Sequence, residues 1–277
     1  MVPAQTYVER FPVPALAARV RTVWVQTIGA EPYLQRNVPT GGVELHCPLG
    51  ELPRLVGPLT GPDVHLLPPH TTVVGARFWP GAGSSLLGLP ADELVDLTVR
   101  TDDLWGAEAR RLGDLLAAAP GPDAALDVLQ RYLVTRLDRA DPPDPLVTEA
   151  VHRLMPWHPV EITALTSQLS ISASQLRRRF LTVVGVRPKV LQRTLRFQGY
   201  LALAQAAAGD AGWRVADLAA ELGYADHAHL SRECQRLTGS TPRELLHDSE
   251  DRCGCGHDHA ASYGPFLAGR ARAVRAG

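Results

Sequence analysis

Two short clusters of polar side chains carry most of the chemistry that this sequence offers. In the first, Leu176 and Phe180 stand four residues apart and would face the core from one side of a helix. Arginine can donate two hydrogen bonds to O6 and N7 of guanine, and serine or glutamine can reach phosphates or base edges. The alternative is that the three successive arginines, residues 177–179, form an ordinary solvated face. We favour contact with the DNA major groove, and the side chains left pointing outward are Ser174, Gln175, Arg177 and Arg178.

The second cluster lies about 54 residues further along the chain. Asp226 stands where it would cap the start of a helix, and Gly239 where that helix would end. Leu230 would turn inward, and Arg232 is our candidate for a specific base contact. Glu233 would repel phosphate unless it accepts from cytosine N4 or pairs with an arginine. The two histidines could contact bases or phosphates, or be ordinary surface residues. The outward positions are His227, Ala228, His229 and Arg232.

The two clusters belong to an internal repeat. At an offset of 53, Ile162, Leu165, Leu169 and Ile171 match Val215, Leu218, Leu222 and Tyr224; at an offset of 54, Leu176, Phe180, Gly185 and Pro188 match Leu230, Cys234, Gly239 and Pro242. A short helix, a tight turn and a second helix with a polar face is the pattern of a helix-turn-helix unit. The repeat therefore predicts two such units.

These motifs resemble the AraC/XylS family of transcription regulators. The resemblance spans residues 147–247 and rests on the segment 172–180, the Gly185-Val-Arg-Pro188 turn, the connecting segment 190–208 and the stretch from Gly223-Tyr224 to Gly239-Ser-Thr-Pro242. It implies that Ser174, Arg177 and Arg178, and the outward residues of the second cluster, face bases. It also implies double-stranded DNA as a partner, with RNA polymerase, a small-molecule effector and a second copy of the chain as further candidates. Cys234 departs from the phenylalanine usual in the family.

The segment between the two units predicts a long linker helix over about residues 188–208. It carries Arg193 and Arg196 three residues apart, hence on one face, and we expect both at the DNA. A rigid helix of this length would place the two recognition helices on the order of 34 Å apart, one turn of DNA, in successive major grooves.

The N-terminal part of the chain is strand-like. Short β-branched or aromatic runs at residues 20–28, 43–47, 54–58, 64–67 and 72–79, separated by Gly and Pro pairs, predict a small antiparallel barrel or sandwich. Short helices are expected at 81–88 and 91–97, and longer amphipathic ones at 105–119 and 122–138, with Leu112, Leu115, Leu116, Leu126, Leu129, Leu133 and Leu137 on their apolar faces. The predicted fold class is thus α+β in two domains, with an all-α C-terminal domain.

The Pro-rich segment Asp141-Pro-Pro-Asp-Pro145 favours a domain boundary. We expect a sensor or dimerisation domain at 1–140, a linker at 141–146, the DNA-binding domain at 147–247 and a flexible tail at 248–277. The first domain also resembles the sensor side of some actinobacterial AraC-type regulators, through Val56-Gly-Pro-Leu59, Val74-Gly-Ala-Arg-Phe78, Leu87-Gly-Leu-Pro90 and Leu104-Trp105. Its effector is unknown; Trp24, Tyr33, Phe78 and Trp79 could line a pocket or form core.

Charge is unevenly distributed along the chain. Residues 1–145 carry 12 Arg against 17 Asp and Glu, whereas residues 146–247 carry 12 Lys and Arg against 8 Asp and Glu. A basic segment on an acidic body fits a protein in which one domain meets phosphate. The sequence has no apolar run long enough to span a membrane and no signal-peptide pattern, and its four cysteines do not suggest a disulfide framework. We therefore expect a cytoplasmic protein.

The tail contains Cys253, Cys255, His257 and His259, which alternate with small or acidic residues. In an extended segment this spacing places two thiolates and two imidazoles on one side, a ligand set that suits Zn²⁺ or another soft metal ion. A regulator that responds to a metal ion bound by this tail is therefore an alternative to a regulator in which the tail has no role. The competing interpretation is a disordered C-terminus.

An enzyme with a catalytic β-rich domain is the remaining alternative. The sequence has no G-x-S-x-G, P-loop, H-E-x-x-H or G-x-G-x-x-G motif. The polar residues that could line a catalytic cavity, or only its rim, are His46, His65, His70 and Arg77. We expect a regulator rather than an enzyme.

Overall fold

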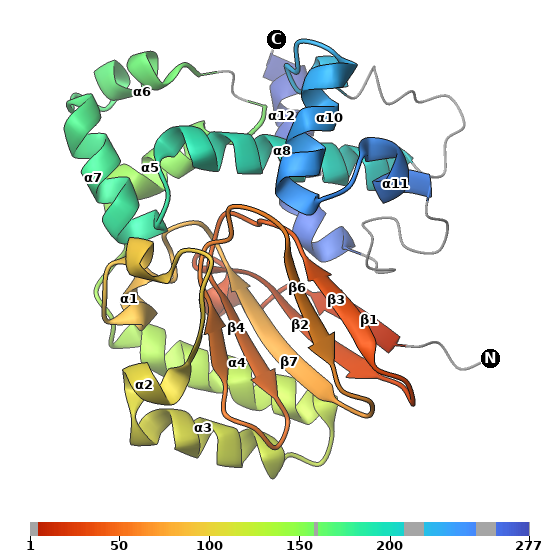
Figure 1. The fold of residues 1–277 in the computed structure, drawn as a ribbon. Coiled ribbons are helices and arrows are strands. Elements are labelled where there is room, and N and C mark those ends of the chain that lie inside the picture. Colours follow the sequence, from red (N-terminus) through yellow and green to blue (C-terminus); the bar gives the residue numbers. More distant parts are fainter. Residues whose placement is uncertain (1–4, 158–159, 208–218, 248–258, 277) are drawn as a thin grey trace.

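The computed structural model describes residues 5–157, 160–207, 219–247 and 259–276 (Figure 1). An antiparallel six-stranded sheet has the order β1-β2-β7-β4-β5-β8, and a separate two-stranded sheet pairs β3 with β6. The two sheets are not closed into a barrel, so the predicted barrel or sandwich is an open two-sheet arrangement. The strands are β1 (Gln5–Arg10), β2 (Val20–Ile28), β3 (Tyr33–Asn37), β4 (Glu44–Pro48), β5 (Arg54–Val56), β6 (Asp63–Leu67), β7 (Thr72–Phe78) and β8 (Thr98–Arg100).

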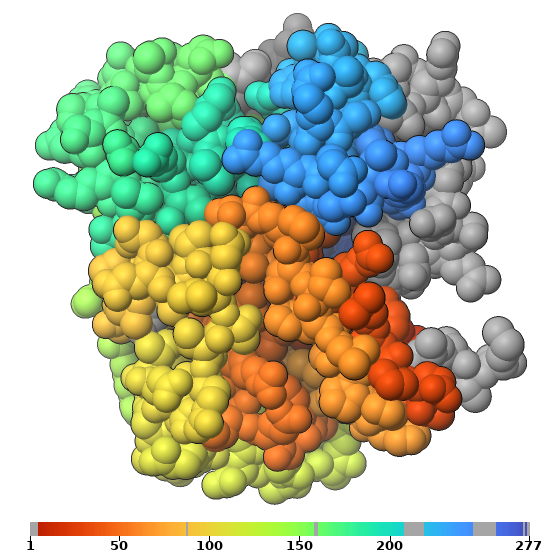
Figure 2. All heavy atoms as spheres, in the orientation of Figure 1, coloured from red at the N-terminus to blue at the C-terminus, as the bar shows by residue number. Residues whose placement is uncertain are grey.

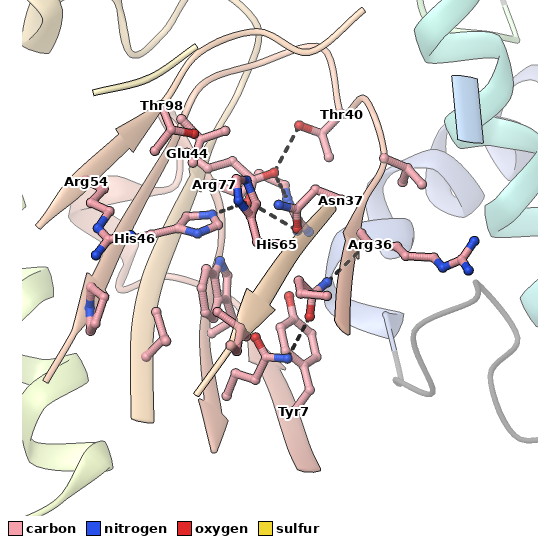
Figure 3. Close-up of a pocket in the computed structure, with 18 of the residues that line it drawn as sticks. Tyr7, Arg36, Asn37, Thr40, Glu44, His46, Arg54, His65, Arg77 and Thr98 are labelled. Atoms are coloured by element: carbon pink, nitrogen blue, oxygen red, sulfur yellow. Dashed lines mark hydrogen bonds and ion pairs between the residues drawn. The ribbon is translucent and has the colours of Figure 1, made fainter. Parts of the chain in front are cut away.

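The two faces of the large sheet have different roles because successive side chains of a strand point to opposite sides. On one face Val23, Leu45, Val74 and Ala76 are buried against the long helix α4 (Pro122–Asp138). The other face carries polar and aromatic side chains and looks toward the β3–β6 sheet (Figure 3). The sheet therefore has one face packed in the core and one polar face toward the smaller sheet.

Helices cover the packed face of the large sheet and close its end. Pro122–Asp138 forms as predicted, with all four of its predicted apolar leucines buried. Leu112 and Leu116 are also buried, but Leu115 is 47% exposed, so its assignment to the apolar face is wrong. The remaining helices of this half are the 3-10 turns η1 (Pro14–Leu16) and η2 (Ala91–Leu94), and α1 (Ser84–Leu87), α2 (Thr101–Trp105) and α3 (Ala107–Ala117).

Five predicted strand runs form strands, and β1, β3 and β8 were not predicted. Strand β1 has the sequence QTYVER and alternates between half-buried and exposed residues. It lies at the edge of the sheet and contains few of the β-branched and aromatic residues on which sequence prediction depends. Its pairing with β2 is a long-range contact, so the short polar segment is a strand only in the folded protein.

The C-terminal half is helical. A second hydrophobic cluster, separate from that of the sheet, includes Leu165, Leu176, Phe180, Leu230 and Cys234, which are all fully buried. The prediction of an all-α domain around a long linker helix is confirmed. The helices are α5 (Pro145–Arg153), α6 (Ile162–Gln168), α7 (Ala173–Val184), α8 (Pro188–Ala207), α10 (His227–Thr238) and α11 (Pro242–His247), with residues 219–221 helical before α10.

The expectation of a flexible tail is wrong over Ala260–Ala276, which forms helix α12. Tyr263 and Phe266 are buried in the C-terminal core, and Ser262 is buried against the sheet. The Gly- and Ala-rich composition suggested disorder because these small residues look featureless in sequence. They are small because the helix lies close against other elements, as described below.

Candidate nucleic-acid interface and ligand cavity

The first recognition helix, α7, begins with a capping box. The Ser172 hydroxyl accepts from the Gln175 backbone N–H at 3.1 Å, and the Gln175 side chain accepts from the Ser172 backbone N–H at 3.0 Å. Gly185 ends the helix in the left-handed conformation, and a Cβ there would lie 2.8 Å from the Ala91 carbonyl oxygen. Glycine is therefore needed twice, for the turn and for the close contact with η2. The predicted base-facing residues Ser174, Gln175, Arg177 and Arg178 are all exposed.

The second recognition helix, α10, has the same construction. The Asp226 side chain caps it by accepting from the His229 backbone N–H at 2.6 Å, and Gly239 ends it in the left-handed conformation. His227, Ala228 and Arg232 are exposed, as a DNA-facing surface requires. His229 is only half-exposed, because its ring contacts the edge of Tyr224 at a centroid distance of 5.3 Å. This contact makes His229 a weaker candidate for base contact than its neighbours.

The two arginines of the linker helix are not both free to meet DNA. Arg193 donates to both carboxylate oxygens of Glu233 at 2.7 and 3.0 Å, and both side chains are largely shielded from solvent. The sequence left open whether Glu233 would repel phosphate or pair with an arginine, and in the structure Arg193 neutralises its carboxylate. Arg196 lies over the ring of Tyr224, with 5.6 Å between the guanidinium carbon and the ring centroid. Both residues join α8 to the second unit.

The two units lie side by side over the β-rich half (Figure 2). The C-terminal end of α7 packs on η2, and the Cβ of any residue replacing Gly239 would approach Pro62 in the β5–β6 loop at 3.8 Å. The C-terminal end of α7 thus packs on the β-rich half and that of α10 approaches it, while the predicted base-facing residues near their N-terminal ends stay exposed. The N-terminal residues of a recognition helix are the ones that usually contact base edges.

A cavity of about 310 Å³ lies between the two sheets (Figure 3). Its floor is a row of aromatic rings across three strands: Trp24 on β2 pairs with Gly75 on β7, which pairs with His46 on β4. The Trp24 indole lies flat over Gly75, where a Cβ would be 2.2 Å from the ring. His46 meets the indole edge-on at 4.9 Å, and Tyr7 lies 5.7 Å from it. This row makes one wall of the cavity aromatic.

An ionic row runs beside the aromatic one. Arg77 donates from Nε to Glu44 at 2.7 Å and from Nη1 to Glu9 at 2.8 Å, and all three side chains are buried. Burial by itself would raise the pKa of each carboxyl, but the positive charge of Arg77 outweighs the effect of burial. Hydrogen bonds from His46 to Glu44 and from His259 to Glu9 act in the same direction as Arg77. The pKa of both carboxyls therefore lies well below the ordinary range. Both carboxylates therefore stay ionised at neutral pH.

A second guanidinium, that of Arg21, borders the cavity, and no carboxylate of the described residues forms an ion pair with it. Its Nη2 donates to Gln198 of α8 at 3.0 Å, and its Nε has no hydrogen-bond partner among the described residues. Burial, with a smaller contribution from the charge of Arg77, lowers the pKa of Arg21 to about 10. A buried guanidinium at a cavity wall with one N–H that lacks a partner favours a ligand that brings a negative charge or a strong acceptor.

Only some of the residues that the sequence suggested for this region line the cavity. His46, His65, Arg77 and Trp24 line the cavity, whereas Phe78 is core and His70 lies in the β6–β7 turn. Tyr33 and Trp79 do not line it. Sequence reasoning missed Arg21, Glu9 and Glu44. A charged residue inside an otherwise apolar strand, such as Arg21 in VRTVWVQTI, is the signal that could have identified one of them.

The predicted metal ligands Cys253, Cys255 and His257 lie outside the described residues. His259 is described, and its Nδ1 lies 2.9 Å from Glu9 Oε1. Within the described parts of the chain, no three His, Cys, Asp or Glu side chains gather as a metal site would require. None of the helices in these described parts is long and apolar enough to cross a membrane.

Two protein families match separate parts of the chain. Residues 8–100 match a family described as a domain of unknown function, DUF6597, and residues 165–248 match a family described as a helix-turn-helix domain. No curated protein matches the chain. Three structures of ToxT from Vibrio cholerae are similar to this chain. An apo variant from strain SCE256 has 12% sequence identity and a TM-score of 0.43, and the match covers 81% of this chain and 96% of that one. The protein from strain O395 has 9% identity, a TM-score of 0.41 and coverage of 88% and 97%, and an unsaturated-fatty-acid-bound form from strain SCE256 has 10% identity, a TM-score of 0.38 and coverage of 88% and 93%.

The paired capped helices and the match at residues 165–248 define the class: this is a DNA-binding transcription regulator. Its C-terminal part is more particularly a helix-turn-helix domain of the AraC type, as the motifs of residues 172–188 and 223–242 implied.

Proposed function

We propose that α7 and α10 read two successive major grooves of one DNA site, and that the chain works as a sensor domain (1–140), a linker (141–146) and a DNA-binding domain (147–247). The observation that carries this is the repetition of one capped, glycine-terminated helix on either side of α8. That helix has 20 residues, about 30 Å in length, which is close to one turn of DNA.

The test is selection of bound sequences from random duplex DNA by the full-length protein at a stated salt concentration. The proposal expects a bipartite motif whose halves are about 10 base pairs apart. Arg178→Ala should erase preference in one half, and Arg232→Ala in the other. Arg179→Ala is the matched control, because Arg179 pairs with Asp144 beside the first recognition helix rather than on its outward face. A motif from one unit alone would contradict the two-groove arrangement.

We also propose that the cavity binds a small-molecule effector. Its volume suits a compact ligand, its floor is aromatic, and Arg21 would favour an acceptor or anionic group. A screen of small planar carboxylates by thermal shift, with Trp24→Ala as the variant lacking the floor, would test this. Stabilisation of the wild type that is lost in the variant is the expected result, and equal shifts in both would contradict it.

The cavity is better suited to binding than to catalysis. His46 and Glu44 do converge there, with His46 Nε2 3.4 Å from Glu44 Oε2. However, Glu9 and Glu44 are both held as ion pairs by Arg77, and a lowered pKa makes a carboxylate a poor general base and no acid at neutral pH. We therefore propose a regulator without enzymatic activity. Turnover of any ligand that binds, lost in Glu44→Gln, would contradict this.

The tail remains our proposed metal site, with Cys253, Cys255, His257 and His259 as ligands for Zn²⁺ or another soft metal ion. The sequence spacing of the four residues supports it. In the described structure His259 contacts Glu9, so metal binding would compete with that contact. Zinc titration of the full-length protein against Cys253→Ser/Cys255→Ser would test it, with binding of equal affinity as the contradicting result.

Three further expectations complete the proposed function. The protein would act in the cytoplasm, where its DNA is; RNA polymerase would be its partner if it activates transcription; and it could bind DNA as a homodimer. Sedimentation of the protein with and without its selected DNA would test the homodimer.

A further inference from the structure

Helix α12 touches three parts of the molecule that are far apart in sequence. It packs along α8 and reaches β1 and β2 of the large sheet, and Figure 1 shows it passing behind α8 and α10. Phe266 is fully buried in the C-terminal core, with the Arg21 guanidinium of β2 5.5 Å from its ring centroid. This one helix therefore links the sensor half to the DNA-binding half.

The first turn of α12 is held by the ionic row of the cavity. Glu9 Oε2 accepts from the Ser262 backbone N–H at 2.9 Å, and Arg77 Nη1 donates to the Ser262 hydroxyl at 2.6 Å. A carboxylate at a helix N-terminus stabilises it by accepting from an otherwise unpaired N–H. His259, Ser262 and Tyr263 also line the cavity. A ligand in the cavity would thus touch the residues that anchor α12.

The other end of α12 is attached to the second helix-turn-helix unit. Arg270 donates through two nitrogens to Glu221, which lies just before the turn that leads into α10. At Gly269 a Cβ would lie 2.8 Å from Cδ1 of Trp157, so this ring, from the segment between α5 and α6, packs directly on the helix backbone. Helix α12 therefore also touches the segment that precedes the first unit, whereas α7 itself packs mainly on η2, α5 and α6.

The sequence of α12 makes a poor helix on its own. Gly264, Pro265 and Gly269 occupy its interior. Glycine and proline are the two residues least favourable in a helix interior, and proline also removes one backbone hydrogen bond. Short helices without strong propensity are stable only through packing. The helical state of this segment therefore depends on its being docked at both ends.

We propose that α12 is the coupling element of this regulator: its docking on Glu9 and Arg77 at the cavity sets how firmly the second helix-turn-helix unit is held, while α7 of the first unit is held by its packing on η2. This rests on the proposed function of the cavity and of the two units. A cavity ligand would act by strengthening or weakening the first turn of α12. The effect would reach α10 through Arg270 and Glu221 and through the packing on α8.

The two glycines of α12 provide one variant near each end of the helix. Gly264→Ala adds a Cβ to the residue before Pro265, which disfavours the helical conformation there, so it should weaken the first turn of α12. Gly269→Ala would place a Cβ 2.8 Å from Trp157, so it should weaken the packing at the other end. Hydrogen exchange of the full-length protein is the measurement. Amides of α10 should exchange on the order of fivefold faster in both variants, while amides of α7 stay unchanged.

The cavity end of the coupling is tested by Ser262→Ala, which removes the hydroxyl that accepts from Arg77. It should speed exchange in α10, and combining it with Gly269→Ala should add little, because both act through the same helix. Arg270→Ala should do the same from the far end, with Arg272→Ala on the same helix as its control.

The outcomes separate the inference from the proposed function. If wild-type protein selects a bipartite DNA site but exchange in α10 is the same in Gly264→Ala, Gly269→Ala and Ser262→Ala, α12 does not couple the two regions. Equal changes in α7 and α10 would also overturn the proposal, since they would indicate general destabilisation. If wild-type protein selects no bipartite site while the α10 effects occur, the coupling stands and the two-groove arrangement fails.

Discussion

The two helix-turn-helix units share one pattern but are held in place differently. In the first, Phe180 fills the core, and Gly185 lets α7 pack directly on η2. In the second, the corresponding core residue is the much smaller Cys234, and the unit is held in addition by the Arg193–Glu233 pair and by α12. A unit with less core of its own depends more on contacts from outside. The second unit is therefore the one on which we expect a bound effector to act.

The largest expected effect contrasts the two core positions. Phe180→Ala should lower the free energy of unfolding by about 3–5 kcal/mol, because it leaves a cavity the size of a phenyl ring. Cys234→Ala removes a single buried sulfur and should cost about 1 kcal/mol, comparable to the loss of one methylene. Urea unfolding of both variants is the measurement. Similar losses would mean that the two cores contribute equally and that the comparison is mistaken.

The anchor of α12 on the sensor side should be sensitive to acid. The folded-state pKa of Glu9 and Glu44 lies below the ordinary value of 4.5, so their stabilisation is complete above that pH and is lost as the pH falls below it. Each carboxyl should contribute a slope of up to about 1.4 kcal/mol per pH unit in that range. Urea unfolding at a series of pH values would measure this. Glu44→Gln should flatten the dependence, and an unchanged slope would show that this carboxyl is not ion-paired as described.

The two recognition helices should contribute more equally to DNA binding than Phe180 and Cys234 contribute to stability. Arg178→Ala and Arg232→Ala should each cost about 1–3 kcal/mol of binding to the selected site and relax preference in one half of it. Competition binding at fixed salt, with intact and half-scrambled sites, would measure this. A uniform loss on all sequences would instead identify the arginine as a phosphate contact, which positions the protein without reading sequence.

The smallest effect concerns the attachment of α10 to α8. Because the Arg193–Glu233 pair retains some exposure, we expect a coupling free energy of about 1 kcal/mol between Arg193→Ala and Glu233→Gln. The quantity to measure is affinity for the half-site of α10, with the half-site of α7 as internal control. If Arg193→Ala weakened both halves equally and Glu233→Gln neither, Arg193 would be a DNA contact after all.

Much of the DNA-binding domain could be predicted because its signals are local. The capping box at Ser172, the cap at Asp226 and the terminal glycines each act within one helical turn, so the order of residues along the chain specifies them. The repeat with period 53 to 54 then shows that the pattern occurs twice. The strands at β2, β4 and β7 were also predictable, because their core-face side chains are apolar and buried, and several of those in β2 and β7 are β-branched.

The sensor cavity could not be predicted because it depends on strand pairing. Glu9, Glu44 and Arg77 lie 33 or more residues apart, and they meet only because β1, β2, β7 and β4 are neighbours in a particular register. A shift of one residue would turn each side chain to the other face. Likewise, nothing local shows that Arg193 would meet Glu233 instead of a phosphate.

The sequence by itself thus determined two capped recognition helices, the helix between them and a β-rich domain before them, since hydrophobic period and capping act over a few residues. Only the tertiary structure decided that a polar cavity forms between two sheets, that Arg21 lies beside it with no partner for Nε among the described residues, and that a Gly- and Pro-containing tail becomes a helix. These features depend on burial and ion pairing between distant segments. A weak helix such as α12 exists because docking supplies the stability that its own residues lack.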